Sequence, residues 1–141
     1  MPDTAALECL RALIAGAPVS LLVTNRADGP PAIRPMQTVL VDADFAVWFA
    51  TGRASDKCRQ IAADPRVTVY WQQPDVWHYG EISGVAEVVD TPEARHRFWQ
   101  DDWSQYFPGG RDDPQYVLIR VTPERAICHH MQDGSTRNVE F

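Results

Sequence analysis

Apolar positions near the start of the chain recur with the period of an α-helix. From Leu7 to Ile14 they fall on one helical face, and Gly16 and Pro18 follow directly. Glycine and proline are typical of the residues that end a helix. The pattern therefore predicts a short amphipathic helix over residues 4–15.

The chain after this helix changes to short apolar runs separated by turn residues. Such runs, bounded by Gly, Pro, Asp or Asn, are typical of β-strands. Gly84 indicates a bulge or a bend, and Pro35 indicates an edge strand or a bulge. Thr122 and Pro123 predict a reversal between the last two strands, and a polar tail follows. The pattern predicts strands over residues 19–24, 32–41, 45–51, 67–72, 78–89, 116–121 and 126–131.

Two further helices are expected between these strands. One covers residues 55–63, with Ser55 as a good N-cap. The other begins with a threonine–proline pair and covers residues 91–103, and residues 104–115 form a loop. Connections this short leave no room for repeated crossover helices, and the sequence lacks a G-x-G-x-x-G motif. We therefore expect one domain over residues 1–141, a mainly β antiparallel barrel of six to seven strands with short helices.

Composition narrows the classes of partner. Thirteen Lys and Arg against nineteen Asp and Glu give a formal charge of −6, which argues against nucleic-acid and anionic-membrane binding. No stretch is long and apolar enough to span a bilayer, and no signal peptide is visible, so we expect a cytoplasmic protein. A chain of 141 residues is too short for two domains with a cleft between them. A large ligand must therefore bind a surface groove or a shared interface.

The three cysteines are odd in number and far apart in the sequence, at Cys9, Cys58 and Cys128. This spacing predicts neither a disulfide framework nor a zinc site, and it fits a reducing compartment. Cys58 follows a predicted helix start, where thiolates are favoured. The simpler interpretation is a small buried residue on the inner face of that helix.

The segment from Thr51 to Lys57 is the strongest candidate for chemistry. It lies where a predicted strand ends and a helix begins, and the N–H groups of a helix start attract anions. Thr51 and Ser55 supply hydroxyl groups, Lys57 supplies a full charge, and Arg53 lies between them. These groups suit a phosphate. The alternative is that Ser55 only caps the helix and that Lys57 is a solvated side chain.

A second candidate segment lies on a neighbouring strand. It consists of Arg34, Pro35, Met36, Gln37 and Thr38. The arginine can meet a carbonyl or a phosphate, and the irregular backbone at the proline can face a flat ring. The alternative is a surface arginine. A hairpin that brings both segments to one groove strengthens both interpretations.

The order of motifs along the chain resembles the pyridoxamine 5'-phosphate oxidase-like FMN-binding split barrels. Residues 107–119 resemble in particular the general stress protein 26 branch, and the resemblance covers about residues 5–128. The segments that carry it are Leu22-Val23-Thr24, Asp28-Gly29, Arg34-Pro35-Met36, Trp48-Phe49-Ala50-Thr51, Ser55-Asp56-Lys57, Asp64-Pro65-Arg66-Val67 and Gly84-Val85-Ala86-Glu87.

The resemblance implies a homodimer of split barrels with FMN bound between the subunits. It implies that Thr51, Ser55 and Lys57 hold the phosphate, while residues 34–38 lie along the isoalloxazine and ribityl groups. Ala50 would present its backbone to the flavin. FAD stays open as an alternative cofactor.

One position departs from the family pattern beside the phosphate lysine. The oxidases commonly carry a basic residue there, and this chain has Asp56. We expect Arg53 to compensate for that charge.

The resemblance implies an FMN-dependent oxidoreductase that acts on a small molecule, with a nicotinamide reductant. True vitamin B6 oxidation is disfavoured because the chain lacks the Arg-Leu-His-type segment that grips that substrate. A flavin-binding carrier or stress-response protein without turnover is the alternative, followed by a haem-binding relative. No side chain is a compelling general acid or base.

Aromatic and histidine residues complete the candidates. Most of the five tryptophans are expected in the core or a dimer interface, and Trp103 is expected to stack on the flavin of the partner subunit. His129 and His130 are adjacent on a predicted strand. They therefore face opposite sides and cannot readily chelate one metal ion. We expect one to be buried and the other exposed.

Overall fold

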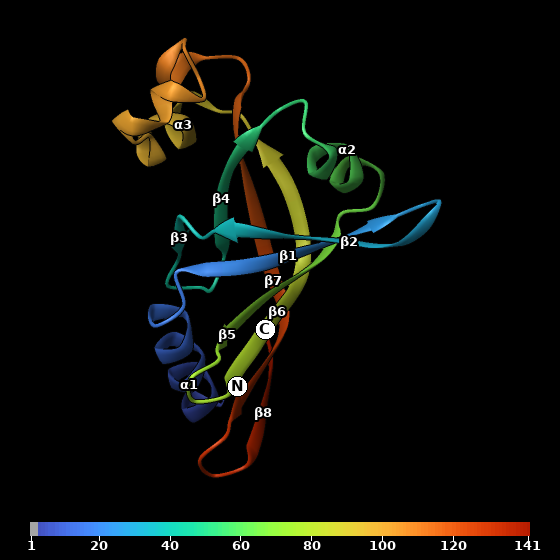
Figure 1. Ribbon diagram of the computed structural model, residues 1–141, viewed down its shortest axis with the longest axis vertical. Helices are drawn as coiled ribbons and strands as arrows, with labels where there is room; N and C mark the ends of the chain where they lie inside the picture. Colours follow the sequence, from blue (N-terminus) through green and yellow to red (C-terminus); the bar gives the residue numbers. More distant parts are fainter. Residues whose placement is uncertain (1–2) are drawn as a thin grey trace.

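Residues 3–141 are described by a computed structural model (Figure 1). An eight-stranded antiparallel sheet has the strand order β2-β1-β5-β6-β7-β4-β3, and β8 pairs with β7. The strands are β1 (Val19–Arg26), β2 (Gly29–Gln37), β3 (Leu40–Val41), β4 (Val47–Gly52), β5 (Arg66–Gln73), β6 (His78–Val89), β7 (Tyr116–His130) and β8 (Ser135–Glu140). The helices are α1 (Thr4–Ala15), α2 (Asp56–Ala63) and α3 (Pro92–Phe98), with 3-10 turns η1 (Asp101–Gln105) and η2 (Gly110–Asp112).

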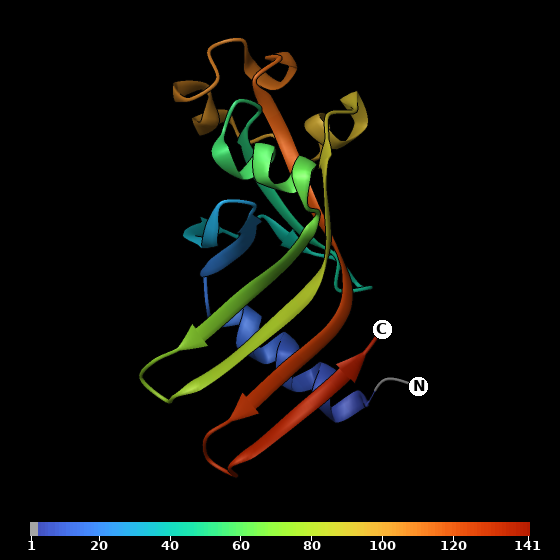
Figure 2. The same ribbon diagram turned by 90° about the vertical axis from the view of Figure 1, so that its right-hand side faces the viewer.

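Helix α1 confirms the helical pattern at the start of the chain. The Asp3 carboxylate accepts a hydrogen bond from Ala5 N at 2.9 Å and so caps the first turn. Ala6, Leu10 and Leu13 are buried. Figure 2 shows the helix lying across the face of β5–β8. The apolar stripe thus covers the lower end of the sheet.

The core lies on the face of the sheet that α1 and α2 cover. Its largest fully buried side chains include Leu22, Phe49, Trp71 and Ile82. A second cluster under α3 centres on Tyr116 and contains both Trp48 and Phe98. This second cluster supports the segment that carries η1 and η2.

The prediction of a reversal at Thr122 and Pro123 was wrong, because β7 runs without a break from Tyr116 to His130. Pro123 lies opposite Gly84, where the pairing of β6 and β7 shifts register. A bulge tolerates a residue without an N–H. A Cβ atom at Gly84 would lie 1.9 Å from the Thr122 carbonyl oxygen. The bulge expected at Gly84 is therefore confirmed, and it accommodates the proline that suggested a turn.

Other boundaries also differ from the sequence prediction. The strand predicted over residues 32–41 is divided into β2 and β3, which lie at opposite edges of the sheet. The expected polar tail forms β8, with Val139 as its buried residue. The helix predicted over residues 91–103 ends at Phe98, since Trp99 has an extended ψ of 134°. Residues 101–105 continue as the separate turn η1. Strand β2 lies at the sheet edge, which confirms the interpretation of Pro35.

The cysteine interpretation also needs correction. Cys9 and Cys128 form a disulfide across 119 residues of sequence. Helix α1 crosses the face of β7 that carries Cys128. The spacing of the cysteines in the sequence could not predict that the fold brings Cys9 and Cys128 together. The argument for a reducing compartment therefore loses its basis. Cys58 is free and buried, as the simpler interpretation predicted.

Within residues 3–141, no helix combines the length and the apolar character needed to cross a bilayer.

Candidate functional site

A groove of about 380 Å³ lies between the end of β2, the end of β4, the start of α2 and the η1 turn. The sheet brings β2 and β4 to this place although several strands separate them in the sheet order. Most of the predicted site residues line the groove, namely Pro35, Met36, Gln37, Ala50, Thr51, Lys57 and Trp103.

The end of β4 and the first turn of α2 form one end of the groove. The Lys57 ammonium donates a hydrogen bond to Thr51 Oγ1 at 2.9 Å. Burial lowers the pKa of Lys57 below its usual value, and the positive charge of Arg34 adds to this effect. A cation that is partly desolvated beside a second positive charge gains stability when an anion binds. This end of the groove therefore suits an anionic ligand.

Ser55 precedes the first turn of α2 but does not cap it with its side chain. Its Oγ atom is buried, and it has no hydrogen-bond partner among the residues described. An unpartnered buried hydroxyl costs about 1–3 kcal/mol. A phosphate oxygen can accept this hydrogen bond, and the free N–H groups at the helix start favour the same anion. The residues present therefore fit a phosphate group.

Arg34 and Thr38 belong to the candidate segment but are not among the residues that line the groove. The Arg34 guanidinium donates to Thr24 Oγ1 at 2.7 Å and to Gln60 Oε1 at 2.8 Å. Thr38 Oγ1 lies 3.1 Å from Ser20 Oγ. Arg34 thus links β1, β2 and α2, the helix that carries Lys57, and its positive charge contributes to the lowered pKa of Lys57.

Arg53 and Asp56 are both held by other residues. Arg53 forms an ion pair with Asp90 at 3.0 Å and donates to the Pro114 carbonyl oxygen at 2.8 Å. Asp56 is paired with Arg59. The acidic charge next to Lys57 is therefore balanced by Arg59, whereas we expected Arg53 to do so.

An aromatic wall closes the other side of the groove. It consists of Trp103, Tyr106 and Phe107. Trp103 and Phe107 pack on the buried ring of Tyr116, with ring centroids 5.8 and 5.4 Å away. Tyr116 donates a hydrogen bond to the Arg95 carbonyl oxygen at 2.9 Å, and burial raises its pKa to about 12. Tyr106 stays 69% exposed at the rim.

The sequence prediction included Trp103 but not the other two aromatic residues as site residues. Their signal was their position within four residues of Trp103, near the start of the predicted loop. The buried Tyr116 on β7 explains why this loop has a fixed place. That contact depends on long-range packing, which a local pattern does not reveal.

Comparison with known proteins gives the family. Residues 5–139 match the family described as pyridoxamine 5'-phosphate oxidase like. The chain belongs to this family. General stress protein 26 of Bacillus subtilis (strain 168) is 24% identical over 83 residues, which cover 57% of this chain. The match spans 59% of that relative's length.

Solved structures show that this family member is a split barrel. A protein related to general stress protein 26 from Clostridium acetobutylicum matches with a TM-score of 0.83 at 19% identity, over 99% of this chain and 96% of the other. An FMN-binding protein related to pyridoxamine 5'-phosphate oxidase, from Nostoc punctiforme, has a TM-score of 0.71 at 19% identity, over 95% and 85%. A heme binding protein from Mycobacterium smegmatis has a TM-score of 0.75 at 19% identity, over 99% and 59%. The predicted fold class is confirmed, although the sheet has eight strands where six to seven were expected.

The adjacent histidines of this family member lie far from the groove, near the end of β7. His129 stacks on Tyr79 at 4.8 Å, and His130 stacks on His78 at 3.9 Å on the other face. The opposite directions agree with the strand geometry, but both side chains are half-buried, so the prediction of one buried and one exposed histidine was wrong. Among residues 3–141, no three His, Cys, Asp or Glu side chains are grouped to hold a metal ion.

Proposed function

We propose that this protein binds FMN in the groove, with the phosphate held by Thr51, Ser55 and Lys57. The observation that carries the proposal is the buried Ser55 hydroxyl, which has no partner among the described residues and belongs to the same strand–helix junction as the Lys57–Thr51 hydrogen bond. A phosphate supplies the acceptor that Ser55 lacks and the negative charge that the desolvated ammonium lacks. The FMN-binding relative with the same fold supports this choice.

The flat ring of the flavin fits between β2 and the aromatic wall. Trp103 and Tyr106 line the same groove as residues 35–37 of this chain. We therefore place Trp103 on the flavin of its own chain, whereas the sequence suggested the flavin of the partner subunit. Proline at position 35 leaves no N–H there, and aromatic rings stack on a flat conjugated system. These contacts orient the ring and exclude water from one of its faces.

We propose that a second copy of the chain completes the groove. The outer face of β1 and β2 exposes apolar side chains, with Val19 at 54% and Ile33 at 63% exposure. Ile33 lies opposite Val23 in the pairing of the two strands. Val19 alternates onto the same side of β1 as Val23, so the three side chains share one apolar face. A symmetric dimer would cover this face and create two equivalent sites.

The flavin, when bound, supplies hydride and electron transfer. The side chains of the groove hold and orient it, and Lys57 carries the only charge among the described lining residues. We therefore propose an oxidoreductase in which the bound ring reacts directly with a small-molecule substrate and a nicotinamide reductant. The same scarcity of acid and base groups favours a second candidate, a flavin carrier without turnover.

Anaerobic mixing of the FMN-loaded protein with NADH or NADPH distinguishes the two candidates. Rapid loss of the oxidised flavin absorbance, restored by an electron acceptor, identifies the oxidoreductase. A bound flavin that stays oxidised with both nucleotides identifies the carrier. A protein that fails to bind FMN but develops a haem absorption band when haem is added contradicts both.

A further inference from the structure

A second pocket, of about 410 Å³, lies directly on the Cys9–Cys128 disulfide. It is formed by α1 and the ends of β6, β7 and β8, at the end of the sheet opposite α2 and α3 (Figure 1). Both cysteines line it. Cys9 is half-buried, whereas Cys128 is only 2% exposed. Of the two cysteines, Cys9 is therefore the more accessible to a molecule in this pocket.

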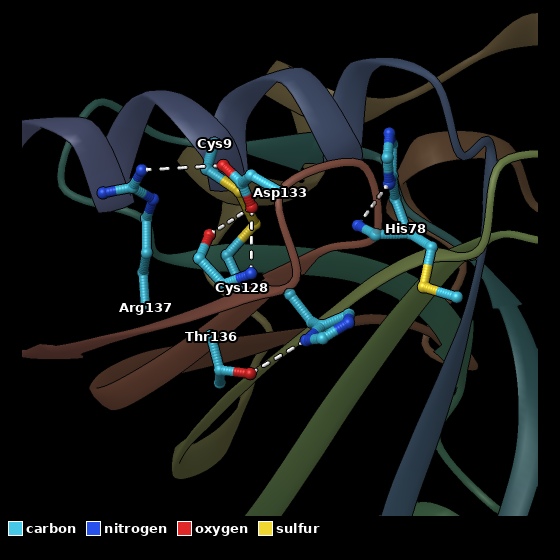
Figure 3. Close-up of a disulfide and its surroundings, with 9 residues drawn as sticks. Cys9, His78, Cys128, Asp133, Thr136 and Arg137 are labelled. Carbon is cyan, nitrogen blue, oxygen red and sulfur yellow. Dashed lines mark hydrogen bonds and ion pairs between the residues drawn. A yellow bond between two sulfur atoms is a disulfide. The ribbon is translucent and has the colours of Figure 1, made fainter.

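Charged side chains of both signs surround this disulfide. Arg137 on β8 lies opposite Cys128 in the pairing of β7 and β8, so the two side chains share one face. Asp133 Oδ2 lies 4.0 Å from Arg137 Nη2. Glu8 of α1 also lines the pocket. Figure 3 shows Asp133 and Arg137 beside the disulfide. The pocket thus offers a cation for a carboxylate and carboxylates for an ammonium.

We propose that this pocket is a thiol–disulfide exchange site for a small thiol that carries both an amino and a carboxylate group. This is the chemistry of an amino-acid thiol or a short peptide thiol. The pocket volume suits such a ligand, since sites for small molecules span about 300–1,000 Å³. Arg137 binds the carboxylate, while Glu8 and Asp133 attract the ammonium.

The exchange takes place in two balanced steps. The ligand thiolate attacks Cys9 Sγ, a ligand–Cys9 disulfide forms, the Cys9–Cys128 bond breaks, and Cys128 leaves as a thiolate. A second ligand thiolate then attacks the ligand sulfur, releases the ligand disulfide and leaves Cys9 as a thiolate. Two ligand thiols are oxidised, and the protein disulfide is reduced by two electrons and takes up two protons.

Arg137 determines which of the two sulfur atoms leaves in the first step. A thiolate leaves more readily when a nearby positive charge stabilises it, and Arg137 places a guanidinium on the face of the sheet that carries Cys128. Because Arg137 faces Cys128 and Cys9 is the accessible sulfur, the geometry favours a mixed disulfide on Cys9 with Cys128 as the leaving group.

The exchange would release a covalent tether without removing α1 from the sheet. Ala6, Leu10 and Leu13 stay buried in the core beside the disulfide. The helix therefore keeps its apolar contacts in the reduced protein, and the oxidised form can be restored by the reverse exchange. This reversibility is what a site that responds to the thiol–disulfide balance requires.

The test measures how fast the native disulfide reacts with L-cysteine and with uncharged 2-mercaptoethanol, each rate divided by that of the urea-unfolded protein. Trapping free thiols by alkylation, followed by peptide mass spectrometry, locates the mixed disulfide. We expect a preference for L-cysteine in the native protein only, and a mixed disulfide on Cys9. Equal normalised rates for the two thiols, a mixed disulfide on Cys128, or three free cysteines after air oxidation would each overturn the proposal.

An Arg137→Gln variant tests the role of the guanidinium. Exchange should slow by about threefold or more, because the departing Cys128 thiolate loses the positive charge beside it. Arg125→Gln removes the same charge from the opposite face of β7 and serves as the matched control. Arg137→Lys keeps the charge and should retain most of the rate. Equal rates for Arg137→Gln and Arg125→Gln, with circular dichroism unchanged in both, would contradict the proposal.

Discussion

The Lys57 ammonium donates a hydrogen bond to Thr51 Oγ1 at 2.9 Å, and this contact joins the first turn of α2 to the end of β4. It places a positive charge at a helix start where N–H groups are free to bind an anion. Arg34 supports this arrangement through a hydrogen bond to the Gln60 side chain, which belongs to the same helix. The predicted phosphate site depends on this junction of a strand with a helix.

Replacing Lys57 tests the charge at this junction. A Lys57→Met variant should bind FMN roughly 10- to 100-fold more weakly, because a hydrogen bond to a charged group contributes about 1.5–3 kcal/mol. Flavin fluorescence titration measures the affinity. Arg66→Met removes an equal charge from an exposed ion pair with Asp64 and should leave FMN affinity unchanged. Similar losses in both variants would show that only net charge matters.

Lys57 is also the only lysine in the sequence. A lysine-selective acylating reagent, followed by peptide mass spectrometry, therefore reports on this one side chain. Bound FMN should slow acylation of Lys57, because a phosphate held by the ammonium shields it. Riboflavin at the same concentration, which lacks the phosphate, should protect it less. Equal protection by the two ligands would place the phosphate elsewhere.

A Ser55→Ala variant should weaken FMN binding without destabilising the fold. Removing an unpartnered buried hydroxyl should leave the free energy of unfolding unchanged or raise it by up to about 1 kcal/mol. FMN affinity should nevertheless fall. Thr91→Ala provides the contrast, since Thr91 caps α3 through Ala94 N at 3.3 Å and its loss should cost about 1 kcal/mol of stability without altering affinity. Urea denaturation and FMN titration check both, and a Ser55→Ala protein with wild-type affinity would contradict the assignment.

Tyr116 predicts a loss of stability at alkaline pH. Burial raises its pKa from the ordinary 10.0 to about 12 in the folded protein. The folded state therefore holds this proton more tightly, so stability is present below pH 10 and is lost as the pH rises toward 12. The difference amounts to roughly 2–3 kcal/mol. Urea denaturation across this pH range measures the free energy of unfolding. It should fall less steeply with pH in the Tyr116→Phe variant than in the wild type, and equal slopes would disprove the explanation.

The disulfide predicts a redox-dependent melting temperature. Cys9 and Cys128 close a loop of 119 residues, and such cross-links contribute about 2–5 kcal/mol, mainly by restricting the unfolded chain. A Cys9→Ala variant should therefore melt at a lower temperature than the oxidised wild type. Reduction should lower the melting temperature of the wild type toward that of the variant, and it should leave the melting temperature of the variant unchanged. Identical melting of oxidised wild type and variant would argue against the cross-link.

Local patterns predicted most elements of this fold. The spacing from Leu7 to Ile14 gave the first helix, and the edge position of Pro35 followed from its missing N–H. Long-range pairing explains the failures. Pro123 resembled a turn because its opposite residue, Gly84, is remote in the sequence. The Cys9–Cys128 bond was invisible for the same reason.

The candidate site was predictable to a similar degree. Helix-start chemistry and the family resemblance pointed to Thr51, Ser55 and Lys57, which the structure brings to one strand–helix junction. The partners of Arg34 and Arg53 were not predictable, because Gln60 and Asp90 approach them only through the fold. Those contacts decide which cations face the groove.

The central claim is that the groove binds FMN through its phosphate. Isothermal titration of the purified protein with FMN and with riboflavin tests it most directly, because the two ligands share the ring and differ in the phosphate. We expect saturable FMN binding at one molecule per chain, at least about tenfold tighter than riboflavin, as a charge-assisted phosphate contact requires. Equal affinities for the two ligands, or no saturable binding of FMN, would contradict the account.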